Sequence, residues 1–150
     1  MSKPEPFVVT QEDHQPLHIL GESVSVLASV ERTGSFEVFL QEGPEGAGPL
    51  PHTHAWDEAY YVIGGAIDVL TGDRTQTIGQ GEFIFIPGGT PHGFRIKTAR
   101  TRFLSFNSRG GASAFFRDID REAGDTFDIG KMVHIADRHA VHVVARPPAP

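Results

Sequence analysis

Cysteine is absent from this chain of 150 residues, which excludes disulfide bonds and thiolate metal ligands. Lysine is scarce, since it occurs only at Lys3, Lys97 and Lys131, and no long basic run is present. The formal net charge of −6 and the isoelectric point near 5.7 disfavour polyanionic partners. We therefore expect neither nucleic acid nor an anionic membrane surface as a partner.

Long hydrophobic runs are also missing. Residues 1–10 contain no apolar core of signal-peptide length, and no later stretch approaches the length of a membrane span. We therefore expect a cytoplasmic protein. The chain length fits one domain with a hydrophobic core of its own.

From His18 onward the sequence is built of short segments rich in Val, Ile, Phe and Tyr, which favour strands. Turn residues separate them, and Gly64-Gly65 predicts a two-residue hairpin. Many short strands at this spacing favour a sandwich or barrel over an alternating helix–strand fold. The expected strands are Ser23–Val30, Ser35–Gln41, Glu58–Ile63, Ala66–Leu70, Arg74–Ile78, Glu82–Ile86, His92–Lys97 and Thr101–Asn107.

The pattern changes after Gly110. Ala112, Phe115, Phe116 and Ile119 recur at the spacing of an amphipathic helix. A second helix is expected over Ile129–Ala140 with Asp128 as its N-cap, followed by a strand over Val141–Val144 and a proline-rich tail over Arg146–Pro150. We expect an N-terminal arm over 1–17, a β domain over 18–110, and C-terminal helices and a tail over 111–150.

Four side chains predict a metal site. His52 and His54 are spaced i, i+2, so that in a strand both point to the same face. Glu58 can join them if the chain turns between Ala55 and Asp57, and His92 follows in a second glycine- and proline-punctuated segment. Burying several unpaired polar groups costs a few kcal/mol each, roughly, and a cation removes that cost.

The donor set restricts the metal. Mixed imidazole and carboxylate ligands suit divalent Fe, Mn, Ni, Co, Zn or Cu, whereas all-oxygen sites suit Mg or Ca. Four protein ligands on a six-coordinate ion leave two positions for substrate or water, while zinc more often settles at four ligands. We expect one divalent transition metal, Fe, Mn, Ni or Co, with Zn or Cu possible.

The two segments resemble both signature motifs of the cupin superfamily. They are Gly46-x5-His52-x-His54-x3-Glu58-x6-Gly65 and Gly81-x5-Pro87-x-Gly89-x2-His92, separated by residues that can form a hairpin. The resemblance covers roughly residues 18–107 and implies a double-stranded β-barrel of the jelly-roll type, with metal ligands at His52, His54, Glu58 and His92. We expect the two C-terminal helices to pack outside this barrel. One position departs from the motif, because Ile96 stands where cupins usually carry Asn.

A further resemblance, to quercetin 2,3-dioxygenase-like cupins, is carried by residues 91–95, 114–118 and 137–141. It favours a dioxygenase-type oxidoreductase acting on a small aromatic or enol-bearing substrate. Glu58 would then act as metal ligand and as general base. The alternatives are a non-redox metal-dependent isomerase, cyclase or lyase, and a small-molecule-binding cupin without turnover.

Strand alternation predicts the neighbours of the metal. If Glu58 and His92 point inward, so do Tyr60, Phe94 and Ile96, while Arg95 points outward. On an earlier strand Phe36, Val38 and Leu40 are expected to share one face, and on another strand Phe83 and Phe85 are expected to do so. We expect Tyr60, Phe94, Ile96 and Val38 to line an apolar pocket and Trp56 to lie at its mouth. We also expect a homodimer, formed through sheet edges and an arm around 7–9.

Overall fold

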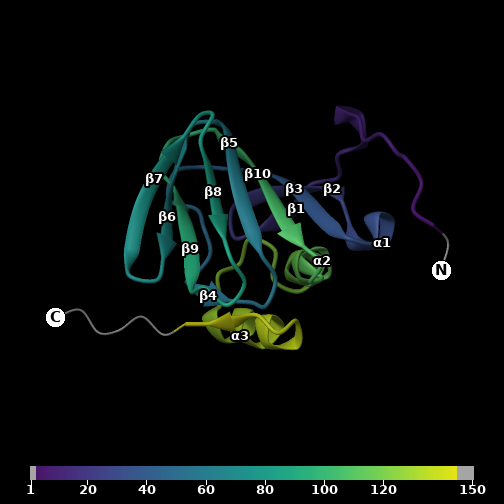
Figure 1. The fold of residues 1–150 in the computed structure, drawn as a ribbon. Helices are drawn as coiled ribbons and strands as arrows, with labels where there is room; N and C mark the ends of the chain where they lie inside the picture. The colour runs from purple at the N-terminus through teal and green to yellow at the C-terminus, as the bar shows by residue number, and fades with distance from the viewer. Residues whose placement is uncertain (1–2, 145–150) are drawn as a thin grey trace.

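In a computed structural model, residues 3–144 form two antiparallel β-sheets whose open end is covered by helices (Figure 1). In the described chain the first sheet has six strands in the order β1-β2-β3-β10-β5-β8. Their bounds are β1 Leu17–Ile19, β2 Glu22–Ala28, β3 Phe36–Gly43, β10 Thr101–Ser108, β5 Glu58–Gly64 and β8 Phe83–Ile86.

The second sheet has five strands within residues 3–144, in the order β11-β4-β9-β6-β7. Their bounds are β11 His142–Val143, β4 His52–Thr53, β9 His92–Ile96, β6 Ala66–Thr71 and β7 Arg74–Gly79. The two sheets face each other in the arrangement of a jelly roll, as the sequence predicts, although hydrogen bonds do not close them into a continuous barrel.

Short helical elements and two longer helices complete the fold. They are η1 Gln11–Asp13, α1 Val30–Thr33, α2 Ala112–Glu122 and α3 Ile129–Arg138. Asp128 caps α3 as predicted, because its Oδ1 accepts a hydrogen bond from the Lys131 N–H at 3.0 Å. The predicted tail Arg146–Pro150 lies outside the described residues.

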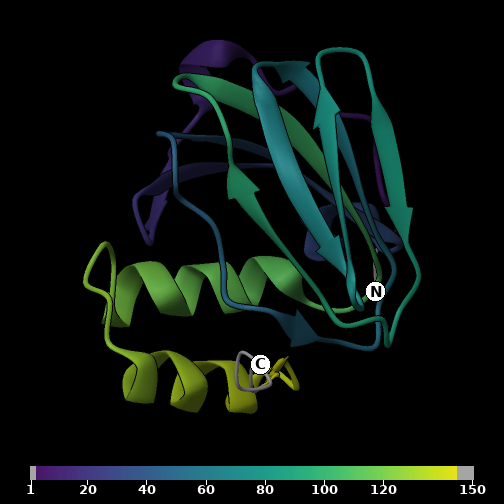
Figure 2. The same cartoon turned by 90° about the vertical axis from the view of Figure 1, so that its left-hand side faces the viewer.

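Helices α2 and α3 lie side by side across one end of the sheets (Figure 2). Ile119 of α2 and Ile135 of α3 are buried in one core cluster with Phe39 and Val24 from the strands. The ring of Phe116 meets that of Phe39 edge-on, with centroids 4.9 Å apart. The helices therefore lie outside the strands and cover the end of the space that the sheets enclose.

The predicted hairpin at Gly64-Gly65 is wrong. Strand β5 belongs to the first sheet and β6 to the second, so this dipeptide carries the chain from one sheet to the other. Gly65 has φ +82°, and a Cβ there would lie 2.4 Å from the Thr101 Oγ1, so the corner is too tight for a side chain. The residues between the two motifs do form the expected hairpin, made of β6 and β7, in which Thr71 pairs with Arg74.

On β3 the side chains that face the interior are also not the predicted ones. Glu37, Phe39 and Gln41 are buried, whereas Phe36 is 50% exposed. Phe83 and Phe85 do share a face, but it is the outer face, with exposures of 59% and 57%. Hydrophobic alternation failed here because the interior of this fold carries partnered polar groups, which leaves large apolar side chains outside.

Candidate metal centre

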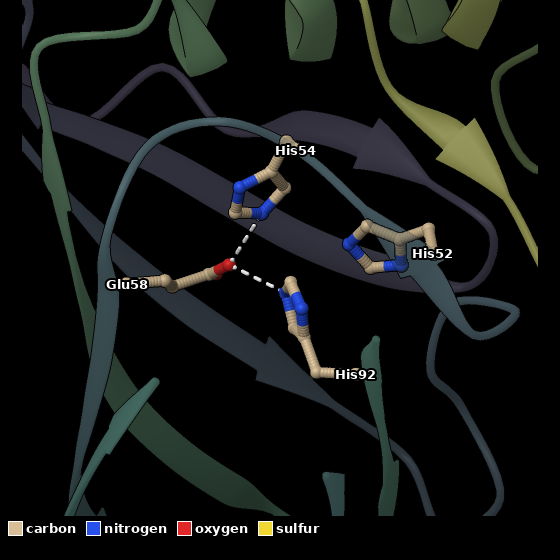
Figure 3. A group of neighbouring side chains, drawn as sticks. All are labelled: His52, His54, Glu58 and His92. Atoms are coloured by element: carbon tan, nitrogen blue, oxygen red, sulfur yellow. Dashed lines mark hydrogen bonds and ion pairs between the residues drawn. The ribbon is translucent and has the colours of Figure 1, made fainter. Parts of the chain in front are cut away.

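Two loop–strand segments bring the four predicted ligands together (Figure 3). His52 lies on β4 directly opposite His92 on β9. After His54 the chain bends at Ala55 and Trp56 and enters β5 at Glu58, as the sequence argument required. One ligand atom from each of the four residues lies within 4.8 Å of the others.

The three imidazoles are oriented by backbone carbonyl groups. The Nδ1 of His52 donates to the Leu50 carbonyl at 2.7 Å, that of His54 to the Trp56 carbonyl at 3.0 Å, and that of His92 to the Thr90 carbonyl at 2.8 Å. A carbonyl oxygen only accepts, so each Nδ1 carries a proton. The Nε2 of each ring is thereby left for a metal, and the ring orientation is fixed.

The remaining nitrogens converge on a carboxylate. The Nε2 atoms of His54 and His92 each lie 2.9 Å from the Glu58 Oε2. In neutral imidazoles with protonated Nδ1, these Nε2 atoms carry lone pairs that face a negative oxygen. Such an arrangement is repulsive unless a proton or a cation lies among the atoms. The donor set therefore fits a divalent transition metal.

The pKa shifts follow from this crowding. Burial alone would raise the pKa of Glu58, but the hydrogen bonds from His54 and His92 outweigh it and hold the pKa far below its usual range. Burial and the neighbouring His92 lower the pKa of His52 to about 4. Burial acts to lower the pKa of His92 as well, yet the hydrogen bond with Glu58 raises it. The carboxylate is therefore ionised at neutral pH, and His92 holds a proton more readily than His52.

A polar network supports the site from behind. Ser105 Oγ donates to the Glu58 Oε1 at 3.3 Å, and Asn107 Nδ2 donates to Ser105 Oγ at 2.9 Å. The Trp56 Nε1–H donates to the Asn107 Oδ1 at 3.0 Å, while the Trp56 ring stacks on His54 with centroids 4.0 Å apart. The network runs from one ligand to another, and all of its members are buried.

Sequence reasoning did not identify Ser105 and Asn107. The alternation of side chains along β10 could have identified them, because both residues share the inward face of the strand with Phe103. Polar residues at inward positions of a strand need partners, and the ligand Glu58 on the neighbouring strand supplies one.

Trp56 was placed wrongly by sequence reasoning. Its side chain is 7% exposed and belongs to the core cluster beneath α2, so it lies behind His54 and not at the cavity mouth. A Cβ on Gly110 would come within 2.4 Å of the Trp56 ring, so that the ring position depends on a glycine at this point.

A cavity opens from the metal centre toward the helices. His52, Glu58, Tyr60 and Phe94 line it, together with apolar side chains of α2 and α3. Tyr60 and Phe94 thus lie where the sequence placed them, and the Arg95 side chain points outward. Ile96 is buried in the neighbouring hydrophobic cluster and does not line the cavity. The predicted pocket position of Val38 is wrong, because Val38 lies on the opposite face of β3 from Phe39 and Gln41.

The family follows from these features. Residues 39–107 match the family model described as a cupin domain, so this part of the chain is a domain of the cupin superfamily. The chain is 35% identical over 107 residues to quercetin 2,3-dioxygenase of Bacillus subtilis strain 168. That match covers 68% of this chain and 31% of the relative, so the chain spans about a third of the length of the curated relative.

Solved structures show the same fold. The polyketide cyclase RemF from Streptomyces resistomycificus is 26% identical, with a TM-score of 0.60, over 69% of this chain and 80% of that one. The protein KdgF from Halomonas sp. is 20% identical, with a TM-score of 0.64, over 69% of this chain and 94% of that one, which shows the fold alone.

None of the helices within residues 3–144 is long and apolar enough to cross a membrane.

Proposed function

We propose that this cupin is a metal-dependent oxidoreductase of the dioxygenase type that acts on a small aromatic or enol-bearing substrate. The observation that carries the proposal is the opening of the His52, His54, Glu58 and His92 cluster onto a cavity lined mainly by apolar and aromatic side chains. The similarity to quercetin 2,3-dioxygenase supports the choice of chemistry.

His52, His54, His92 and Glu58 would hold the ion through three imidazole nitrogens and one carboxylate oxygen. A bound Fe, Mn, Ni or Co ion would supply open coordination positions and Lewis-acid or redox chemistry, with Zn or Cu as the other metals that the donor set accepts. The chain supplies the orientation of those ligands and surrounds them with a mainly apolar cavity lining.

Glu58 is placed to accept a proton from the substrate. Its lowered pKa keeps it ionised, and its Oε1 is held by the Ser105 hydroxyl. A substrate hydroxyl that enters beside the cluster can transfer its proton to this carboxylate. Tyr60 and Phe94, whose rings meet edge-on at 5.6 Å, form an aromatic wall against which a planar ring can pack.

The test is oxygen consumption by protein reconstituted separately with Fe, Mn, Ni, Co, Cu and Zn, with flavonols and catechols as substrates. The proposal expects oxygen uptake in step with substrate loss for at least one redox-active metal. Substrate loss at an equal rate without oxygen would refute the dioxygenase proposal and favour a non-redox isomerase, cyclase or lyase. The similarity to the polyketide cyclase supports this alternative. Binding of these compounds without turnover would assign a binding function.

A further inference from the structure

A second buried carboxyl group lines the same cavity. Glu22 begins β2 and is 4% exposed, and Gln41 on the adjacent β3 is likewise 4% exposed. The Gln41 Nε2 donates to the Glu22 Oε1 at 3.2 Å. Both side chains line the cavity that also contains His52 and Glu58. In the sheet, β3 and β10 separate β2 from β5, so Glu22 and Glu58 approach the cavity from different strands.

This pair has unused hydrogen-bonding capacity. The Glu22 Oε2 and the Gln41 Oε1 make no hydrogen bond to any residue of the described chain. Among those residues, Ser113 Oγ is the one fully buried side-chain polar atom without a partner. The two free oxygens are therefore not sealed in protein but open to the cavity. Polar atoms in an apolar cavity are costly unless they meet a partner, so the pair is built to meet one.

The charge state of the pair limits that partner. Burial raises the pKa of Glu22 to about 8, although the hydrogen bond from Gln41 and the positive charge of Arg95 act to lower it. At neutral pH Glu22 is thus an uncharged carboxylic acid that can donate one hydrogen bond. Arg95 itself is occupied, since its Nη1 donates to the Pro49 and Phe94 carbonyl groups at 2.8 Å and 3.0 Å. No Lys or Arg of residues 3–144 lines the cavity.

Tyr60 lines the cavity together with Glu22 and Glu58, and its ring packs edge-on against that of Phe94. A ligand that meets Glu58 with one oxygen can pass the aromatic wall of Tyr60 and Phe94 and bring another polar group to Glu22 and Gln41.

We infer that Glu22 and Gln41 form a second polar binding site in this cavity, which holds an uncharged hydroxyl or carbonyl group of the substrate. The inference rests on the proposed function for the enol or phenol group that faces the metal centre. It narrows the substrate class to uncharged aromatic compounds with at least two separated oxygen groups. Carboxylates and phosphates are disfavoured at this site because it offers no cation.

The test compares the binding of two flavonols without oxygen, so that no oxygen-dependent turnover occurs. Quercetin carries hydroxyl groups distant from its enol, whereas 3-hydroxyflavone lacks them and keeps only the enol hydroxyl and the adjacent carbonyl group. Glu22→Leu should weaken quercetin binding about tenfold, the typical cost of one lost hydrogen bond at a buried polar site. The same variant should change 3-hydroxyflavone binding less than about twofold, and Gln41→Leu should behave in the same way.

Glu22→Gln is the matched control, because it keeps the size and a donor but does not ionise. The ratio of the wild-type affinity for quercetin to that of the Glu22→Gln variant should change between pH 7 and 9, because Glu22 loses its proton in this interval and the amide does not. The ionisation of the ligand is common to both proteins. This comparison decides the matter even if Glu22→Leu does not fold.

Any of three results would overturn the inference. Glu22→Leu could weaken the binding of both flavonols equally, or neither flavonol could bind. The ratio of wild-type to Glu22→Gln affinity for quercetin could also stay the same as the pH changes. Failure of the proposed function gives a different result. In that case Glu22→Leu would still weaken quercetin binding more than 3-hydroxyflavone binding, but no metal-loaded protein would consume oxygen with either compound.

Discussion

At the scale of single residues, the Oε2 of Glu58 is the point on which the metal centre depends. Two imidazole nitrogens face it at 2.9 Å, and each ring is held from its other side by a backbone carbonyl. The chain thus fixes the direction of the ligands before any ion binds. The two proposed roles of Glu58, metal ligand and proton acceptor, can be separated by a substitution that removes only the basicity of its side chain.

We predict that Glu58→Gln retains much of the metal and loses turnover by at least about a hundredfold, the usual effect of removing a general base. The amide keeps the size and one oxygen ligand but cannot accept the substrate proton. Metal content and turnover of the same preparations measure the two effects. Wild-type turnover in the metal-loaded variant would limit Glu58 to the role of a ligand.

Glu22 gives a second prediction at this scale, on stability. The pKa of its carboxyl group is about 8 in the folded chain and has the ordinary value of 4.5 when unfolded. Between these values the folded state holds a proton that the unfolded state has released. The free energy of unfolding therefore falls as pH rises through this interval, by at most about 1.4 kcal/mol per pH unit.

Urea unfolding of metal-free protein at pH 5, 6.5 and 8 measures this effect. Glu22→Gln should lose this part of the pH dependence and become more stable than wild type toward pH 8. Glu45→Gln, at an exposed position, should follow wild type. If Glu22→Gln and wild type show the same pH dependence, Glu22 is not protonated in the folded chain.

At the scale of elements, helix α2 begins without a capping side chain of its own, because its N-cap is Gly111. A buried carboxylate from β3 replaces it. The Glu37 Oε1 accepts from the Ser113 N–H at 3.2 Å, and its Oε2 accepts from the Val30 N–H at 3.1 Å at the start of α1. One fully buried side chain thus serves two helix starts.

We predict that Glu37→Ala lowers the free energy of unfolding by about 2 to 4 kcal/mol, since two buried N–H groups lose their acceptor. Glu37→Gln keeps one acceptor oxygen and should cost less than half of that. Glu31→Ala, on the surface of α1, should cost less than about 0.5 kcal/mol. Chemical unfolding measures all three, and equal stability of Glu37→Ala and Glu31→Ala would contradict the capping role.

Much at the element scale could be predicted from sequence. Glycines and alternation placed the strands from Glu58 to Asn107 to within a residue or two, and both long helices and the Asp128 cap are confirmed. The four converging ligands are confirmed as a cluster, because strand parity fixed the facing of His52 and His54 and the bend at Ala55 fixed that of Glu58.

The errors share one physical cause. Hydrophobic alternation predicts apolar side chains on the inner face, yet Glu22, Glu37 and Gln41 are buried inside and Phe83 and Phe85 are exposed outside. These buried polar side chains are stabilised by hydrogen bonds to residues far away in the sequence. Gln41 lies 19 residues from Glu22, and Ser113 lies 76 residues from Glu37. Pairings across strands and helices at such separations depend on the register of the sheet, which a local pattern does not contain.

At the scale of the whole molecule, the outer face of the first sheet is apolar. Phe85, Ala59, Phe106 and Val38 lie opposite one another in one row across β8, β5, β10 and β3. Phe83, Tyr61, Leu104 and Leu40 form the next row. Four of these side chains, Phe83, Phe85, Tyr61 and Phe106, are exposed, whereas Ala59 and Leu40 are buried. Exposed aromatic side chains that lie close together on a sheet favour association between copies of a chain.

We predict a homodimer that uses this outer face. Phe85→Lys should shift the protein toward the monomer in light scattering at micromolar concentration, because a buried charge opposes the contact. Ile129→Lys, at an exposed apolar position on α3, is the matched control and should leave association unchanged. A wild-type protein that remains monomeric across this range would refute the dimer.

Elemental analysis of protein purified without added metal tests whether His52, His54, Glu58 and His92 together hold one metal ion. We expect about one divalent transition metal per chain in wild type. We expect almost none in His92→Ala, with the barrel still folded by circular dichroism, and wild-type content in His134→Ala, whose ring lies on the surface of α3. A wild-type protein without metal, or a His92→Ala variant that keeps it, would contradict the account.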